Sequence, residues 1–229
     1  MKLLKTSSIL LLMIISTASV FGQMANVDGL GGNVLRESNY QKIDGSPYLF
    51  DKYKKAYAYN TNGDKFDVFA RYDSYKEEIE VHNGGNPIIL DSKEYRRIEF
   101  NFYDENTNQT VVMMFQNGFE IEGYDKKDYF HVLRDGDTRL LKKITTSKID
   151  ENEASYGGVN NVSSRFVMKE RYVLLKKGQE PIVFKKISKG AVLKAFGDKR
   201  LASYIKQQGL KVKTVADVEQ ITEYYEGLN

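Results

Sequence analysis

The sequence predicts an α+β protein: a mainly antiparallel β-sheet, either curled or folded into a sandwich, followed by three short C-terminal helices. Between residues 48 and 184, short apolar runs alternate with turns rich in Asn, Asp and Gly, the pattern of an all-β segment. The chain holds 16 Tyr and 12 Phe, residue types that favour half-buried strands. After Lys186 the apolar spacing changes from two residues to that of a helix.

Residues 1–22 predict a cleavable secretory signal, and residues 23–45 an extended lead-in. Lys2 and Lys5 precede an uninterrupted apolar run at 9–15, and small residues follow the run. An uncleaved membrane anchor is the alternative interpretation, but the run is shorter than the roughly 20 residues that span a bilayer. We therefore expect an exported protein that is periplasmic, outer-membrane-associated or secreted, with no transmembrane segment in its mature chain.

The antiparallel domain is predicted to span residues 46–186. Apolar side chains alternate with polar ones in 95–103, so one face of that strand should be buried. Residues 111–115 do not alternate, which predicts a central strand covered on both faces. Residues 147–164 are polar and contain Gly, which predicts a long loop. The expected strand pairs are 57–59 with 66–72, 79–81 with 88–90, 95–103 with 111–115, 129–134 with 139–144, and 166–175 with 182–184.

Residues 187–229 predict a helical tail packed on the β domain. Thr214 and Asp217 have the spacing of a capping box, with Asp in the place of Glu. Val218 and Ile221 then lie on an apolar stripe that needs a partner surface. The expected first and last boundary residues of the three helices are Ser188 and Gly197, Asp198 and Gly209, and Thr214 and Gly227.

The residue types present exclude several kinds of chemistry. The absence of cysteine excludes disulfides, thiol nucleophiles and Cys-ligated metal sites. His82 in a turn and His131 in a strand lack metal-ligand spacing and are interpreted as structural. Asp104, Asn106 and Asn108 have the alternate spacing of a calcium loop but lack its Gly at position six and its Glu at position twelve, so they are interpreted as turn residues. No cofactor or metal site is predicted.

Charge is distributed unevenly along the chain. Residues 165–213 contain 14 Lys or Arg and 3 Asp or Glu, a net charge of +11, whereas residues 23–164 carry −6. This pattern indicates either a solvated surface or a docking face for an envelope protein, anionic lipid or cell-wall polymer. A nearly neutral total argues against nucleic-acid binding, which depends on phosphate neutralisation. The predicted docking residues are Lys185, Lys186, Lys189, Lys194, Lys199, Arg200 and Lys206.

Two stretches of the chain carry motifs. The first is Gly45-Ser46-Pro47-Tyr48-Leu49-Phe50-Asp51, followed by the segment from Arg71 to Val81. The second is Tyr129-Phe130-His131-Val132-Leu133, followed by Leu140-Leu141-Lys142-Lys143 and a basic tail ending in Tyr224-Tyr225. Together they resemble a group of uncharacterised exported β-rich proteins common in Bacteroidota. The resemblance implies a lineage and an envelope location, and it implies no activity and no site residues.

Three hypotheses for function follow. The first is a non-enzymatic exported envelope protein with a binding or accessory role in the periplasm or at the outer membrane. The second is a hydrolase that uses paired carboxylates or a divalent cation, for which the 31 acidic residues give no specific pair. The third is a carrier of lipid or another apolar ligand inside a half-open sheet.

Overall fold

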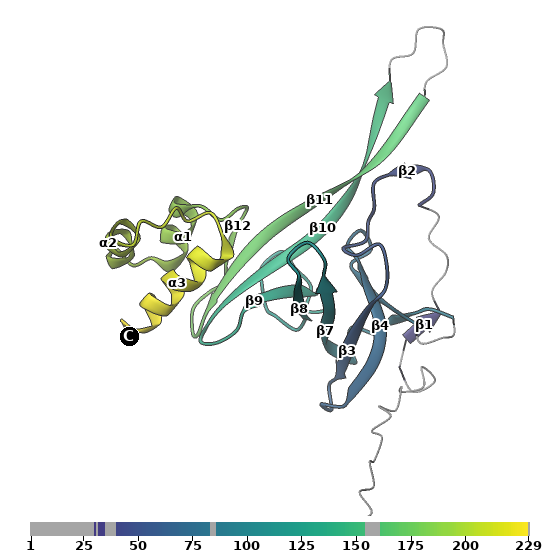
Figure 1. Ribbon diagram of the computed structural model, residues 1–229, viewed down its shortest axis with the longest axis horizontal. Helices are drawn as coiled ribbons and strands as arrows, with labels where there is room; N and C mark the ends of the chain where they lie inside the picture. The colour runs from purple at the N-terminus through teal and green to yellow at the C-terminus, as the bar shows by residue number, and fades with distance from the viewer. Residues whose placement is uncertain (1–29, 31, 35–39, 83–85, 154–160, 229) are drawn as a thin grey trace, which may run out of the picture.

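Figure 1 shows the computed structural model of the chain, which describes residues 30, 32–34, 40–82, 86–153 and 161–228. One large curled sheet forms the body, a long two-stranded ribbon leaves the body at one end, and three helices cover the opposite end of that ribbon. The sheet is antiparallel apart from a single parallel pairing of β2 with β11. This arrangement confirms the predicted fold class.

The strands lie in the order β1-β6-β5-β4-β3-β7-β8-β9-β10-β11-β12, and β2 pairs separately with β11. Neighbours in this order are mostly neighbours in sequence, because the Asn-, Asp- and Gly-rich turns connect adjacent antiparallel strands. The strand bounds are β1 Gly32–Val34, β2 Ile43–Asp44, β3 Lys54–Asn60, β4 Lys65–Asp73, β5 Glu78–His82, β6 Ile88–Leu90, β7 Tyr95–Asp104, β8 Gln109–Gln116, β9 Phe130–Arg134, β10 Thr138–Glu153, β11 Asn161–Lys176 and β12 Ile182–Phe184.

The concave face of the curled sheet holds the main core. Ala56 and Ala58 on β3 are fully buried and pair across the ladder with Phe100 and Ile98 on β7. These small side chains leave room for the aromatic rings that fill the interior, and Phe100 lies edge-to-face with Phe115 at 5.6 Å between ring centres. The alternation predicted for 95–103 is therefore the alternation that builds this core.

The lead-in contributes two short strands to the sheet. β1 pairs with β6 at one edge, and β2 pairs in parallel with β11 at Ser164 and Arg165. Strands of two or three residues have too few side chains for a period to be recognised. The sequence therefore predicted an extended segment there, but not its pairing with the sheet. The expected signal segment at 1–22 lies outside the described residues.

The long loop expected at 147–164 is wrong. β10 and β11 have 16 residues each and stay in register from Thr138 opposite Lys176 to Glu153 opposite Asn161. β10 is largely buried up to Thr146, and beyond it the side chains whose burial is described are exposed or half-buried. Main-chain hydrogen bonds hold the polar residues of that outer part in the strands, so it needs no strict apolar alternation. Residues 154–160, which include the Gly pair of the expected loop, lie outside the described residues.

The expectation that β8 is covered on both faces is also wrong. β8 lies between β7 and β9, as a central strand should, yet the side chain of Val112 is 60% exposed. Nothing in the described part of the chain covers that face of the sheet at Val112. Single exposed apolar residues are common on folded proteins, so an apolar run alone does not indicate burial.

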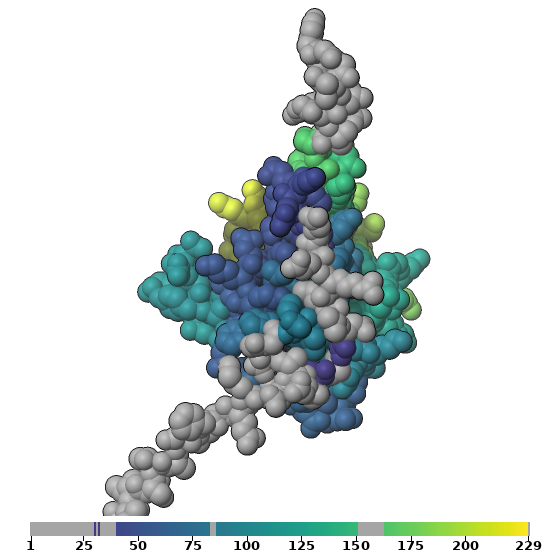
Figure 2. Space-filling model, turned by 90° about the vertical axis from the view of Figure 1, so that its right-hand side faces the viewer, coloured from purple at the N-terminus to yellow at the C-terminus, as the bar shows by residue number. Residues whose placement is uncertain are grey.

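Buried hydrogen bonds at Ile144 and Thr146 add to the β9–β10 ladder in holding the ribbon to the body. The Tyr72 hydroxyl donates to the Ile144 carbonyl at 3.3 Å, and the Thr146 N–H donates to the Ser74 carbonyl at 2.8 Å. The hydroxyls of Ser74 and Thr146 are also 2.7 Å apart and hydrogen-bonded. Beyond Thr146 the ribbon leaves the body (Figures 1 and 2).

Three helices, α1 Lys189–Phe196, α2 Arg200–Gln207 and α3 Val215–Glu226, form the C-terminal module. Ser188 caps α1, and the Thr214–Asp217 capping box is present at α3, as predicted. α2 begins two residues after Asp198, whose carboxylate still accepts the Arg200 N–H at 2.8 Å, and it ends before Gly209.

The helical module packs on the ribbon. Its buried side chains, such as Val218 and Ile221, form one apolar cluster with Leu140 of β10 and Leu174 of β11. This cluster supplies the partner surface that the apolar stripe of α3 requires. Among the described residues, no helix has the length and apolar composition to cross a bilayer.

We expect Phe100→Ala to lower the free energy of unfolding by about 3–5 kcal/mol, because it leaves a cavity among fully buried rings. Urea denaturation measures the change. Tyr103→Ala on the same strand is the matched control: Tyr103 is 55% exposed, so its loss should cost less than about 1 kcal/mol. Equal losses in the two variants would contradict the assignment of the concave face as the core.

Candidate functional site

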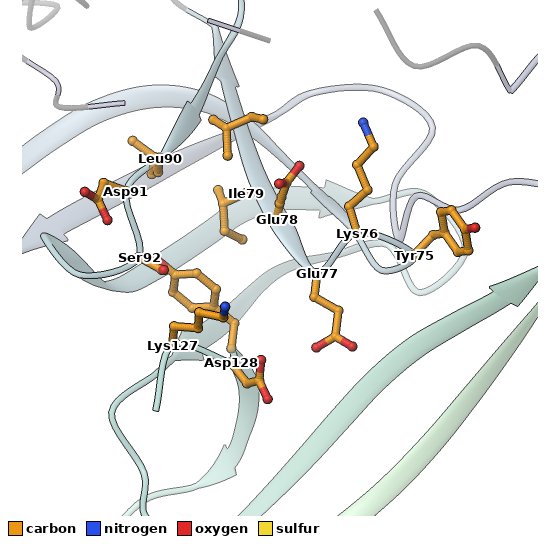
Figure 3. Close-up of a pocket in the computed structure, with 12 residues that line it drawn as sticks. Tyr75, Lys76, Glu77, Glu78, Ile79, Leu90, Asp91, Ser92, Lys127 and Asp128 are labelled. Atoms are coloured by element: carbon orange, nitrogen blue, oxygen red, sulfur yellow. The ribbon is translucent and has the colours of Figure 1, made fainter. Parts of the chain in front are cut away.

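A polar hollow of about 380 Å³ opens where the β4–β5 turn, the end of β6 and the loop before β9 meet (Figure 3). The walls are mostly charged or hydroxylated, with four carboxylates and two lysines at the surface. Tyr129, which is buried, lies at the base. The lining residues are Tyr75, Lys76, Glu77, Glu78, Ile79, Ile89, Leu90, Asp91, Ser92, Lys127, Asp128 and Tyr129.

The ammonium of Lys143 lies beneath this hollow and is almost fully buried, with the side chain 1% exposed. It forms an ion pair with Glu77, lies 3.8 Å from the Asp128 carboxylate, and donates to the Tyr129 carbonyl at 3.4 Å. The ring of Phe130 lies 5.3 Å from the same nitrogen. A buried ammonium needs such partners because desolvation penalises its charge strongly.

Glu77 reaches Lys143 from an unusual backbone conformation. Its φ is +61°, in the left-handed region that non-glycine residues seldom adopt. In Figure 3 the carboxylates of Glu77 and Asp128 point to the same side of the hollow, whereas Glu78 points away from them. The turn therefore points two consecutive glutamates in different directions: Glu77 pairs with Lys143, and Glu78 lines the wall of the hollow.

Glu78 is the carboxylate with the most perturbed surroundings in the hollow. Burial raises its pKa from the ordinary value, Lys76 opposes that rise, and Asp73 and Glu80 add to it. Its Oε2 atom is buried and has no hydrogen-bond partner among the described residues. A carboxylate in this state is a candidate acceptor for a hydrogen-bonding or cationic group of a small ligand.

The chemistry open to this hollow is polar binding. Glu77 and Asp128 share the single positive charge of Lys143, and Glu78 and Asp91 are the other two carboxylates of the wall. Within the described ranges, no three His, Cys, Asp or Glu side chains cluster closely enough to hold a metal ion. A ligand with an ammonium or hydroxyl groups fits this wall better than an anion.

A second polar cluster ties the first sequence motif together. The Arg71 guanidinium donates to Glu80 at 2.7 Å and to the Tyr48 hydroxyl at 3.0 Å, and Glu80 is fully buried. The hydroxyls of Tyr48 and Tyr53 both donate to Glu80 at 3.2 Å. Burial raises the pKa of Tyr53 to about 12 and raises that of Tyr48 further. All groups are satisfied, so this cluster is a structural clamp.

The seven predicted docking residues all lie on or beside the helical module, and all are exposed. Arg200 is held by Asp198 at 2.7 Å, whereas the six lysines have no ion pair with any described carboxylate. Lys199 and Lys206 are seven residues apart and share a side of α2, but Lys189 and Lys194 lie about 140° apart around α1. The structure therefore brings the seven to one module and distributes them around it.

The remaining sequence candidates have structural environments. Asp104 accepts the N–H of Asn106 and the hydroxyl of Thr107 within its own turn, at 3.0 Å each. His131 stacks on Phe115 at 5.3 Å, and its Nδ1 has no partner in the described part of the chain. Burial, and then the ammonium of Lys142, lower the pKa of His131 to about 4.

The sequence reasoning missed Lys143 and the hollow above it. The available signal was position: Lys143 lies between the apolar residues Leu141 and Ile144 on a strand, where a lysine is unusual. Its partners come from segments 66 and 15 residues away, and a single sequence contains no measure of that proximity. No protein-family model matches the chain, and searches among curated proteins and among solved structures returned no significant match.

We expect Lys143→Met to lower the free energy of unfolding by about 3 kcal/mol, because the carboxylates of Glu77 and Asp128 lose a buried countercharge. The matched control is Lys142→Met. That neighbouring lysine pairs at 2.9 Å with Glu170, which is partly exposed, so its loss should cost less than about 1 kcal/mol. Urea denaturation of both variants checks the difference, and equal costs would show that the buried ion pair has no special role.

The lowered pKa of His131 predicts a pH dependence of stability. Its pKa is about 4 in the folded protein and 6.5 without the fold, so the unfolded chain binds the extra proton first as pH falls. The contribution of neutral His131 to the free energy of unfolding is on the order of 3 kcal/mol. It is complete above pH 6.5 and is lost as the pH falls towards 4. His131→Phe keeps the ring stack and should lose less stability than the wild type over that range. Parallel losses in the two proteins would contradict the assignment.

Proposed function

We propose that this chain is a non-enzymatic exported envelope protein, in the periplasm or at the outer membrane, whose helical module docks onto anionic lipid headgroups in a binding or accessory role. The observation that carries the proposal is the set of six exposed lysines on or beside one module, without ion pairs among the described residues. Charges left uncompensated within a protein are available for an external surface of opposite sign.

The lysines project from a rigid support. The module has its own apolar cluster, which includes Phe196, Leu201 and Ile205, and the same cluster joins it to the ribbon. Lys176 adds a buried tie, because its ammonium donates to the Phe196 carbonyl at the end of α1 at 2.9 Å. A charged surface held in this way keeps its orientation when it meets a partner.

The kind of cation favours a diffuse anionic surface over a single structured partner. Six of the seven residues are Lys, whose ammonium is a point charge on a flexible stem. A guanidinium can bind one carboxylate through two hydrogen bonds, but the guanidinium of Arg200 already pairs with Asp198 in this chain. Residues distributed around a module suit a membrane surface, where many headgroups are within reach. The charge of −6 on residues 23–164 would orient the module towards that surface.

The hydrolase hypothesis has one supporting observation. The hollow of Figure 3 is concave and acidic, and the pKa of Glu78 is raised there by burial. Glu78→Gln should abolish any hydrolysis detected in a screen of glycan and peptide substrates, and Glu122→Gln on an exposed loop is the control. The carrier hypothesis gains no support from the interior, where the rings of Tyr72, Phe100 and Phe115 are packed and fully buried.

Co-sedimentation with vesicles tests the main proposal. We expect the purified protein to bind vesicles containing phosphatidylglycerol and cardiolipin but not phosphatidylcholine vesicles. The affinity of the triple variant Lys189→Gln, Lys194→Gln, Lys206→Gln for the anionic vesicles should be lower by a factor of about ten or more. Raising the salt from 0.1 M to 1 M should release the protein, because it shortens the screening length from about 10 Å to about 3 Å.

The control for this experiment removes the same charge elsewhere. Lys52→Gln, Lys55→Gln and Lys93→Gln change three exposed lysines of the body, and this triple variant should bind anionic vesicles like the wild type. If both triple variants bound anionic vesicles equally weakly, net charge alone would explain the effect, and the helical module would have no special role. Equal binding to both kinds of vesicle would contradict the proposal outright.

A further inference from the structure

The ribbon carries an open strand edge at the place where it leaves the body. At the level of Ser164 and Arg165, the β11 edge is covered by β2. The opposite edge, on β10, pairs with Ser74 through Thr146 and then has no strand beside it among the described residues. An uncovered edge is a template for one more strand.

The direction of the backbone groups on this edge is known. The Thr146 N–H points away from β11, because it donates to Ser74. Backbone groups alternate in direction along a strand, so the N–H and C=O groups of Lys148 and Asp150 also point off the open edge, and those of Ile149 point towards β11. Two positions that can accept an added strand therefore flank one position that cannot.

From this edge we propose that two copies of the chain pair through β10, antiparallel, with Ile149 opposite Ile149 on the two-fold axis. In this register Lys148 of each copy lies opposite Asp150 of the other in hydrogen-bonded pairs, and the two isoleucines form the non-hydrogen-bonded pair between them. The occupant of the edge is thus a second copy of this chain.

Charge selects this register over its neighbours. Within one copy, the Lys148 ammonium and the Asp150 carboxylate are 3.0 Å apart, so the two charges lie side by side on one face of the ribbon. The two-fold axis places the Lys148 and Asp150 of the second copy opposite the Asp150 and Lys148 of the first. The four charges then alternate in sign. A shift of the axis to Lys148 would oppose two lysines, and a shift to Asp150 would oppose two aspartates; both arrangements are unfavourable.

The extent of the pairing is set by the body. The ribbon projects from the body as an arm (Figure 1), and in this register residue 152 of the partner would fall opposite Thr146, where Ser74 already lies, so the paired segment is limited to residues 147–151 of each copy and the two chains diverge beyond it. The charges on the edge disfavour strands that lack the matching order, which gives the edge specificity for its own copy. An interface of this length is smaller than the roughly 1,200 Å² of stable complexes, so the dimer is weak and favoured by high local concentration.

The absence of cysteine makes a sharp test available. Opposite residues in a non-hydrogen-bonded antiparallel pair have Cα atoms about 4.5 Å apart, within the range that a disulfide spans. Ile149→Cys should therefore form a disulfide-linked dimer under mild oxidation. Ser147→Cys is the matched control on the same strand and face: its two copies would lie about 13 Å apart along the strands and should give at least fivefold less dimer.

Charge reversal then tests the register. In the Ile149→Cys protein, adding Lys148→Glu should reduce the cross-linked fraction several-fold, and further adding Asp150→Lys should restore it, because the pairs are then complementary again. Equal cross-linking of the Ser147→Cys and Ile149→Cys proteins, or failure of the swapped pair to restore the dimer, would overturn the proposal. The measurement is made without vesicles, so its outcome is independent of the membrane-docking proposal.

Discussion

The buried ammonium of Lys143 is the interaction on which the arrangement of the sheet depends. It lies on β10, yet its partners are Glu77 at the β4–β5 turn and Asp128 and Tyr129 before β9. An ammonium that is 1% exposed is stable only with all these partners in place, so segments distant in sequence must meet at this one point. The β4–β5 turn and the segment before β9, which both line the hollow, are thereby joined to β10 at Lys143.

Much of the fold could be predicted from the sequence, and particular residues explain what could not. The turns, the alternation of 95–103 and the capping box at Thr214 are local, and each has a local physical cause. The ribbon beyond Thr146 was mistaken for a loop because its strands mix polar and apolar residues without a regular period, and strand pairing with little burial leaves no period to detect. The hollow depends on contacts distant in sequence, such as Lys143 with Glu77, and residue types alone do not report such contacts.

The two proposed surfaces lie at different parts of the molecule and use different physics. The helical module offers long-range attraction that needs no defined geometry, and it is anchored to the ribbon through Leu140 and Leu174. The edge at Lys148 and Asp150 offers short-range pairing that depends on strict register. Attachment to a membrane would raise the local concentration of ribbons, so the first surface would favour pairing through the second.

Hydrogen exchange along β10 is the most direct test of the claim that the ribbon is fixed to the body at Lys143. If the clamp holds, the amide of Thr146, which donates to the buried Ser74 carbonyl, should be as protected as amides of the central strand β7. In the Lys143→Met protein, the protection of the Thr146 amide should fall sharply, whereas the amides of β7 should stay protected. Rapid exchange at Thr146 in the unaltered protein, or a Thr146 amide indifferent to the loss of Lys143, would contradict the account.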